Sequence, residues 1–258
     1  MFKKALWLAE RFRRRMAPDV PTRSLDEWEA RHEATVQEAV DRVLPHLPED
    51  GVFLDVGANI GIFTRLLRAA RPGATGYLFE PVERYARMCQ ERFAADDRIE
   101  VVHAAMGDED ATRTIYKAAH NYGANSLVTE IMFDRRPNSA VRPDTVIEEE
   151  EIRLVHGSRW LEARGIERVD VIKTDTEGYD FAVLDGLRGW IERSGCRPVL
   201  HVELLAEDYH PLADRQRAAL DAYVPLGYQE VDLARDLEGT VGDVLLIPAE
   251  KRGSEESP

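Results

Sequence analysis

The run VFLDVGANIG, residues 52–61, decides how this 258-residue chain folds. Its first five residues are apolar except for Asp55, which predicts a buried strand that breaks into a turn. Gly57 and Gly61 bracket that turn, and apolar residues at helical spacing follow. Glycine lets a backbone approach a ligand closely, and the first turn of a helix offers unpaired N–H groups. The run therefore predicts a ligand-binding turn at the end of a buried strand.

Two further acids follow strand-like runs in the same way. Glu80 ends the run at 75–79, and Asp108 follows the run at 99–103 after a turn of small residues. In nucleotide-binding α/β sheets an acid about twenty residues beyond the glycine turn holds a ribose hydroxyl, so the pattern predicts an adenosine-containing cofactor. The turn lacks the Gly-x-Gly-x-x-Gly of nicotinamide binding, and Asp55 would repel a pyrophosphate but attract an ammonium group. S-adenosylmethionine is therefore favoured over NAD.

From residue 51 onward, strand-like and helical patterns alternate along the chain. Such alternation predicts an α/β fold with a mostly parallel sheet, helices on both faces and right-handed crossovers. The last two strand-like runs have no helix between them, only a turn that contains Gly239, so we expect them to pair antiparallel. The expected strands are 52–56, 75–79, 99–103, 169–174, 198–204, 228–233 and 241–247, and the expected helices are 61–70, 82–94, 179–188 and 211–224.

The two ends of the chain lie outside this alternation. We expect residues 1–50 to form an N-terminal helical segment, with a basic amphipathic helix at 1–16 and a helix at 24–47 that covers the core. The α/β domain then spans 51–250, and the polar tail 251–258 is expected to be disordered.

An inserted region at about 112–155 interrupts the domain. Residues 112–117 and 147–155 are expected to be strands, whereas 118–145 is polar and rich in turn formers. Around 121–126 we expect no core element. A long loop in a domain is usually functional or disordered, so we expect this one to lie over the carboxyl edge of the sheet and to shape an acceptor pocket.

Composition narrows the classes of partner. The net charge of −14 argues against a nucleic-acid backbone. Cys89 and Cys196 make no disulfide framework, which fits a reducing cytoplasm. No stretch approaches the roughly 18 apolar residues that span a bilayer. Residues 1–16 carry a net charge of +5, so docking of this helix on the domain and peripheral contact with an anionic membrane both remain open.

A second group of chemically active residues lies on the later strands. Lys173 and Asp175 are two apart and share one side of a strand, and Glu177 lies next to the start of the following helix. His201 and Glu203 share one side of the next strand. Asp175 and Glu203 converge if the two strands are neighbours. They could then bind an acceptor hydroxyl, orient a base or hold a divalent cation, and the sequence commits to no metal.

With both groups in view, the chain resembles the FkbM family of S-adenosylmethionine-dependent methyltransferases. The resemblance covers roughly residues 51–205. It is carried by FLDVGANIG at 53–61, FEP at 79–81, AMGD at 105–108, IKTDTEG at 172–178 and HVE at 201–203.

The resemblance implies a class I methyltransferase fold, which is Rossmann-like, with seven strands, the last of them antiparallel, and usually O-methylation of a hydroxyl. The departures are Thr174 and Thr176 in place of apolar residues, and Tyr179-Asp180 in place of Ala-Glu. The resemblance implies that Asp55, Gly57, Asn59, Gly61 and Glu80 hold the cofactor and that Lys173, Asp175, Glu177 and Glu203 lie near the reaction centre. Asp108 is a further candidate for cofactor binding, because it is the third acid in a row to follow a strand.

We therefore expect a methyltransferase that acts on a hydroxyl of a small-molecule, saccharide or lipid-linked acceptor. Methyl transfer requires removal of the hydroxyl proton, for which Asp175 or His201 is the candidate base, with Lys173 or a cation steadying the alkoxide. The alternative is an accessory protein that binds S-adenosylmethionine without chemistry. A nucleic-acid methyltransferase is disfavoured by the charge and by the lack of an Asn-Pro-Pro-aromatic tetrad after 169–174.

Overall fold

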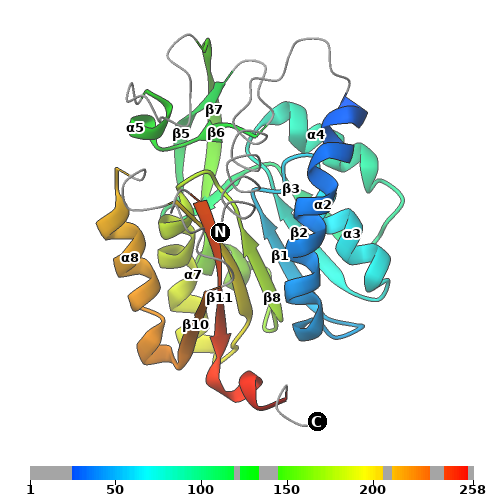
Figure 1. Cartoon of the computed structure of the whole chain (residues 1–258), viewed down its shortest axis with the longest axis vertical. Helices are drawn as coiled ribbons and strands as arrows, with labels where there is room; N and C mark the ends of the chain where they lie inside the picture. Colours follow the sequence, from blue (N-terminus) through cyan, green and yellow to red (C-terminus); the bar gives the residue numbers. More distant parts are fainter. Residues whose placement is uncertain (1–24, 119–122, 134–144, 206–210, 233–240, 255–258) are drawn as a thin grey trace, which may run out of the picture.

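A seven-stranded sheet lies at the centre of the structure, a computed structural model that describes residues 25–118, 123–133, 145–205, 211–232 and 241–254 (Figure 1). Its strands follow the order β10 (Tyr228–Asp232), β11 (Val241–Pro248), β9 (Val199–Leu205), β8 (Val171–Thr174), β1 (Val52–Val56), β2 (Thr75–Phe79) and β3 (Ile99–Val102).

All neighbouring pairs in this sheet are parallel except those that involve β11, which runs antiparallel to β9 and to β10. The predicted fold class, a seven-stranded, mostly parallel sheet with an antiparallel last strand, is therefore confirmed. The chain builds outward from β1 to β3 in one direction and from β8 to β9 in the other. Ligands of such sheets bind where the direction reverses, outside the carboxyl ends of the strands. In this chain that place is between β1 and β8.

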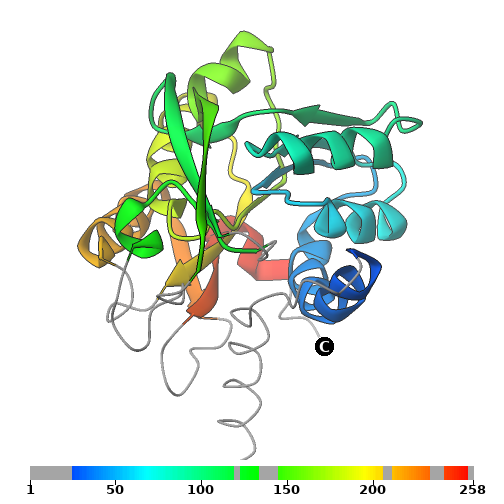
Figure 2. The same ribbon diagram turned by 90° about the horizontal axis from the view of Figure 1, so that it is seen from above.

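Two layers of helices cover the two faces of the central sheet (Figures 1 and 2). Successive side chains of a strand point to opposite faces, so Leu54 packs in the cluster that includes Leu184, whereas Phe53 packs in the cluster that includes Val40 and Phe63. One layer is made of α6 (Gly157–Ala163), α7 (Asp180–Ser194) and α8 (Ala213–Asp221), and the other of α2 (Leu25–Val43), α3 (Ile62–Ala70) and α4 (Glu83–Arg92).

A second sheet stands beside the carboxyl end of the first, with the strand order β4 (Ala105–Gly107), β7 (Ile147–His156), β5 (Ala111–Ala118) and β6 (Asn125–Ser126). The strands expected at 112–117 and 147–155 are confirmed as β5 and β7. The expectation that residues around 121–126 form no core element was wrong for the described part. Ser126 is buried in β6, and Ile131 and Met132 of α5 (Thr129–Met132) are buried with it.

Short 3-10 turns complete the described chain: η1 (Leu44–His46), η2 (Val224–Leu226) and η3 (Ala249–Ser254). The tail expected to be disordered from residue 251 continues instead in η3 as far as Ser254, because Ala249 N donates to Gly227 O at 2.9 Å and anchors its start. The expected basic helix at 1–16 lies outside the described residues. Among the helices that are described, none combines the length and the apolarity that a membrane span requires.

Candidate functional site

The turn that joins β1 to α3 lies at the switch point of the sheet. Gly57, Asn59 and Gly61 have positive φ angles of 76°, 51° and 79°, a conformation that favours glycine. Gly57 N donates to the carbonyl of Phe79 at 3.0 Å. A Cβ on Gly57 would lie 2.0 Å from the carbonyl oxygen of Asp175, so only glycine fits. The turn is thus packed against the ends of β2 and β8, and its other side faces a cavity.

Glu80 follows β2, and its side chain contacts the turn. Its side chain is only 4% exposed, and its two oxygens accept from Asn59 N at 2.7 Å and from Val82 N at 2.8 Å. Burial raises the pKa of Glu80 to about 8, although the two backbone N–H donors act against the rise. The carboxyl group lines the cavity at the position where the sequence predicted a ribose-binding acid.

Asp55 lies beneath the turn and does not line the cavity, unlike the expectation of direct contact with the cofactor. The residue is fully buried. Its Oδ2 accepts from the Thr64 hydroxyl at 2.8 Å, and its Oδ1 lies 3.2 Å from Lys173 Nζ. Because both oxygens are engaged within the protein, the geometry gives Asp55 a supporting position.

Lys173 on β8 is 7% exposed, lines the cavity and contacts the turn. Its Nζ donates to Gly57 O at 2.7 Å and lies 3.8 Å from Asp175 Oδ2. Burial acts to lower the pKa of Lys173, but the carboxylates of Asp55 and Asp175 outweigh it, so the pKa lies above its usual value. Lys173 is therefore a buried, charged ammonium.

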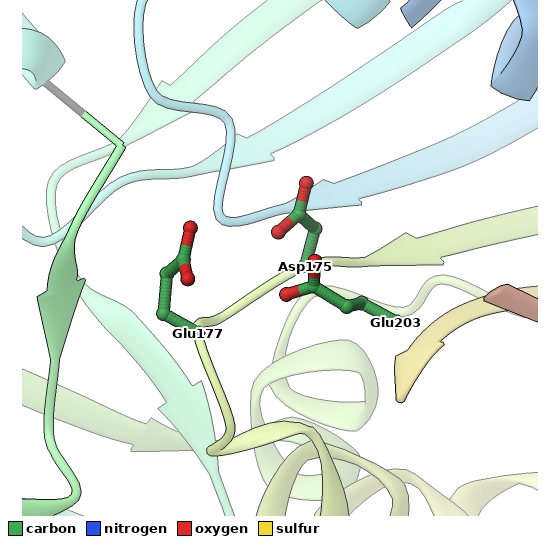
Figure 3. A group of neighbouring side chains, drawn as sticks. All are labelled: Asp175, Glu177 and Glu203. Atoms are coloured by element: carbon green, nitrogen blue, oxygen red, sulfur yellow. The ribbon is translucent and has the colours of Figure 1, made fainter. Parts of the chain in front are cut away.

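Asp175, Glu177 and Glu203 bring three carboxylates together at the ends of β8 and β9 (Figure 3). One oxygen of each lies within 4.8 Å of an oxygen of the others. The predicted convergence of Asp175 and Glu203 is confirmed, because β8 and β9 are neighbours with Lys173 paired to His201. Glu203 is 2% exposed, whereas Asp175 and Glu177 are partly exposed. Carboxylate oxygens of this kind could accept from a hydroxyl or ligate a hard divalent cation.

His201 lies on the same side of β9 as Glu203 and lines the cavity. It is 4% exposed, and among the described residues neither ring nitrogen has a hydrogen-bond partner. Burial lowers the pKa of His201. Asp243 opposes this shift, and Arg42 and Lys173 reinforce it. The imidazole is therefore neutral at neutral pH and has a ring nitrogen that can accept a proton.

Asp108 is not brought into this site. After β3 the chain crosses to the second sheet, so Asp108 follows β4 and is exposed, outside the cavity lining. Ala105 and Met106, which precede it on β4, line the cavity instead. The AMGD stretch thus contributes an apolar wall and not a third acid.

The cavity has a volume of about 360 Å³. Its far wall is formed by α2, which the sequence predicted only as a covering helix. The loop at 118–145 was expected to shape a pocket, and Asn125 and Leu127 of its described part line this cavity. For α2 the one advance signal was His32, a polar residue on an otherwise apolar stripe. The lining residues that sequence reasoning missed include Arg31, His32 and Thr35 on α2, and Ile115 and Tyr179.

Ion pairs hold the first half of α2 over the cavity. Glu29 accepts from Arg92 at 2.6 and 2.8 Å and from Arg65 Nε at 3.2 Å. Glu33 accepts from the same Arg65 at 2.7 Å. These pairs join α2 to α3 and α4, so the wall is tied to the helix that begins at the glycine turn.

The cavity has the features that S-adenosylmethionine requires. Gly57 and Asn59 of the turn line the cavity, and Glu80, which lines it as well, can accept from ribose hydroxyls. Ala105 and Met106 offer an apolar surface to a purine ring. Gly57, Asn59 and Glu80 are therefore the residues in position to hold this cofactor.

Comparisons with known proteins agree with that fit. The family model described as "Methyltransferase FkbM domain" matches residues 55–224. The 2-O-methyltransferase NoeI of Sinorhizobium fredii (strain NGR234) is 28% identical over 142 residues, which are 53% of this chain and 57% of NoeI. The match thus spans less than two thirds of NoeI. Methyltransferase sdnD of Sordaria araneosa is 24% identical over 212 residues, 70% of this chain and 82% of sdnD.

Among solved structures, the chain resembles one from Clostridium thermocellum described as a candidate rRNA methylase. The TM-score is 0.52 at 8% identity, with 82% of this chain and 94% of that chain covered. At this identity the likeness concerns the fold alone, and it agrees with the seven-stranded sheet described above.

Proposed function

We propose that this chain, which belongs to the FkbM methyltransferase domain family and is an S-adenosylmethionine-dependent methyltransferase, methylates a hydroxyl oxygen. The acceptor in this proposal is a small molecule, a saccharide or a lipid-linked compound. The name of the relative NoeI, a 2-O-methyltransferase, supports oxygen as the acceptor atom. The single observation that carries the proposal is the neutral, buried His201 in a cavity that also holds Asp175. A base beside a hydrogen-bond acceptor is what an alcohol needs to lose its proton.

In this proposal the cofactor is held by Gly57, Asn59 and Glu80. When bound, S-adenosylmethionine supplies an electrophilic methyl group. Glu80 would accept from hydroxyls of the ribose, and the backbone groups of the turn would lie beside the bound cofactor. The protein's remaining task is to orient the acceptor oxygen and to take up its proton.

His201 takes that proton at a ring nitrogen. Its pKa is lowered by burial, which keeps the imidazole neutral and ready to accept. Asp175, which lines the cavity, accepts a hydrogen bond from the acceptor and so fixes its position, with the buried Glu203 beside it. Asp175 is the weaker candidate for the base because its carboxylate lies 3.8 Å from the Lys173 ammonium, which stabilises its ionised form.

The acceptor class is tested with methyl-labelled S-adenosylmethionine and a panel of alcohols, free saccharides and lipid-linked saccharides, each beside an amine or thiol analogue. We expect label only in hydroxyl compounds. Transfer only to amines or thiols would overturn the proposal. Binding of the cofactor without transfer to any compound would favour the accessory protein over the enzyme.

The base is tested with His201→Asn. We expect kcat to fall by about 10²-fold to 10³-fold while the Kd for S-adenosylmethionine stays within about threefold. The matched control is His103→Asn, because His103 is exposed and does not line the cavity. The kcat of this variant should stay within about twofold of the wild-type value. If His201→Asn keeps its activity and Asp175→Asn loses it, the base is Asp175.

A further inference from the structure

The ammonium of Lys173 has its hydrogen-bonding capacity used within the protein. An ammonium has three N–H donors. Gly57 O at 2.7 Å and Val56 O at 3.5 Å accept hydrogen bonds from it. Asp55 Oδ1 at 3.2 Å and Asp175 Oδ2 at 3.8 Å are its ion-pair partners. An acceptor alkoxide could therefore bind this ammonium only by displacing one of these partners.

The partners of Lys173 belong to the cofactor turn and to the end of β8. Gly57 O is part of the turn itself. The amide N of Gly57 is fixed separately, because it donates to Phe79 O at 3.0 Å. The contact with Lys173 therefore fixes the second polar group of the same glycine. Both groups of a residue with φ of 76° are held, which defines the direction of the turn.

Asp55 extends this arrangement to the next helix. Its second oxygen accepts from the Thr64 hydroxyl on α3 at 2.8 Å, and Thr64 is fully buried. The contacts thus run from α3 through Asp55 and Lys173 to Gly57. They connect β1, β8, α3 and the turn, and the side chains of Asp55, Thr64 and Lys173 that make them are all buried. Interactions of a buried charge with fixed partners are strong and directional.

We propose that Lys173 is a positioning residue for the cofactor turn, which it holds in its binding conformation by fixing the Gly57 carbonyl and by pairing with Asp55, and that it does not stabilise the acceptor alkoxide. The sequence pattern alone had placed Lys173 at the reaction centre. This inference depends on cofactor binding and not on the identity of the acceptor, so it survives if the hydroxyl proposal fails.

The test is the Lys173→Met variant, which removes the charge and keeps most of the side-chain volume. Calorimetry with S-adenosylhomocysteine should show a Kd raised about 30-fold, because a charge-assisted contact that shapes the turn is lost. The KM for S-adenosylmethionine should rise by a similar factor, while kcat at saturating cofactor stays within about fivefold. A kcat lowered at least about 100-fold, with an unchanged KM, would overturn the proposal.

A second variant keeps the test decisive if Lys173→Met does not fold. Thr64→Val removes the hydroxyl from the other side of Asp55 without a change in volume, and we expect the Kd for S-adenosylhomocysteine to rise about fourfold with kcat unchanged. An unchanged Kd in Thr64→Val would contradict the arrangement. The control is Asp175→Asn, which leaves the contacts of Lys173 with Asp55 and Gly57 in place and should keep that Kd within about threefold.

Discussion

At the scale of single residues, Glu80 has two tasks, and its burial opposes both. It fixes the turn by accepting from Asn59 N and Val82 N, and it faces the cavity where it would accept from a ribose. Both tasks suit the ionised form, yet burial raises its pKa from 4.5 to about 8. A pKa of about 8 favours the protonated form at neutral pH in the free protein, and we expect cofactor binding to favour the ionised form.

The affinity for S-adenosylmethionine should consequently depend on pH. Below pH 8 the Kd should fall by up to tenfold for each unit of rising pH, and above pH 8 it should level off, because the ionised carboxylate binds the hydroxyls better. Calorimetry at pH 6.5 in two buffers of different ionisation enthalpy should detect release of about one proton. The Glu80→Gln variant should bind more weakly and lose this dependence. Equal pH slopes in both proteins would refute the assignment.

The same residue affects stability without ligand. The pKa of Glu80 is higher in the folded protein than its usual 4.5, so the folded state holds the proton more tightly. This contribution is fully present below pH 4.5 and is lost as the pH rises to about 8. Urea titrations of the wild type and of Glu80→Gln should therefore converge at low pH and separate toward pH 8.

At the scale of elements, α2 is attached differently along its length. Its second half places Val40 and Val43 in the core at 0% exposure. No described side chain of its first half, residues 27–35, is buried, and this half is held by Glu29 and its two arginine partners. That half also lines the cavity. The ion pairs therefore attach this part of the wall to α3 and α4.

Replacement of Glu29 by Gln should loosen the wall. We expect the Kd for S-adenosylmethionine to rise about fivefold at low salt, since two partly buried pairs are weakened, and the difference from wild type to shrink as salt rises. Stopped-flow fluorescence should show the change mainly in the dissociation rate. Glu162→Gln is the matched control, because its pair with Arg193 is remote from the cavity and exposed. An equal effect in both variants would contradict this role of α2.

The sequence predicted the elements of the central sheet because each strand is a short apolar run with glycine or acidic residues at its end. It did not predict α6, which spans only seven residues and begins at Gly157 without a capping side chain. It also missed β6, because two residues carry no periodicity. These elements are specified by tertiary contacts, such as the Ser126 hydroxyl that donates to Glu177 O at 2.8 Å.

For the candidate site, the sequence predicted which residues come together but not all of their partners. Alternation along a strand placed Asp175 beside Glu203, and the structure brings them together. The sequence did not predict that Lys173 contacts Gly57, since residue spacing gives the side of a strand but not the partner of a side chain. It did not predict the position of Asp108 either, because after β3 the chain enters the second sheet and leaves the cavity.

At the scale of the whole molecule, α7 joins the two sheets. Leu184 and Leu187 pack in the cluster of the central sheet, while Gly186 lies against β4 of the second sheet. A Cβ on Gly186 would lie 1.9 Å from Gly107 O, so helix and strand touch through their backbones. The two sheets therefore pack against the same helix, and the contact between α7 and β4 has no room for a methyl group.

This contact predicts a contrast between two glycines of α7. Gly186→Ala should lower the free energy of unfolding by about 3 kcal/mol, because the methyl group must separate α7 from β4. Gly189→Ala should be neutral or add up to about 1 kcal/mol, since its methyl group meets only the flexible end of Arg193 and alanine favours helix. Urea unfolding followed by circular dichroism gives both values. Equal losses in the two variants would argue against the backbone contact.

The position of α2 has a consequence for how such enzymes diversify. The family match covers residues 55–224, whereas α2 ends at Val43. The wall that faces the glycine turn is thus encoded in a stretch of gene separate from the one that encodes the turn. Substitutions on the cavity side of α2 would therefore reshape the pocket without changing any residue of the turn that faces it.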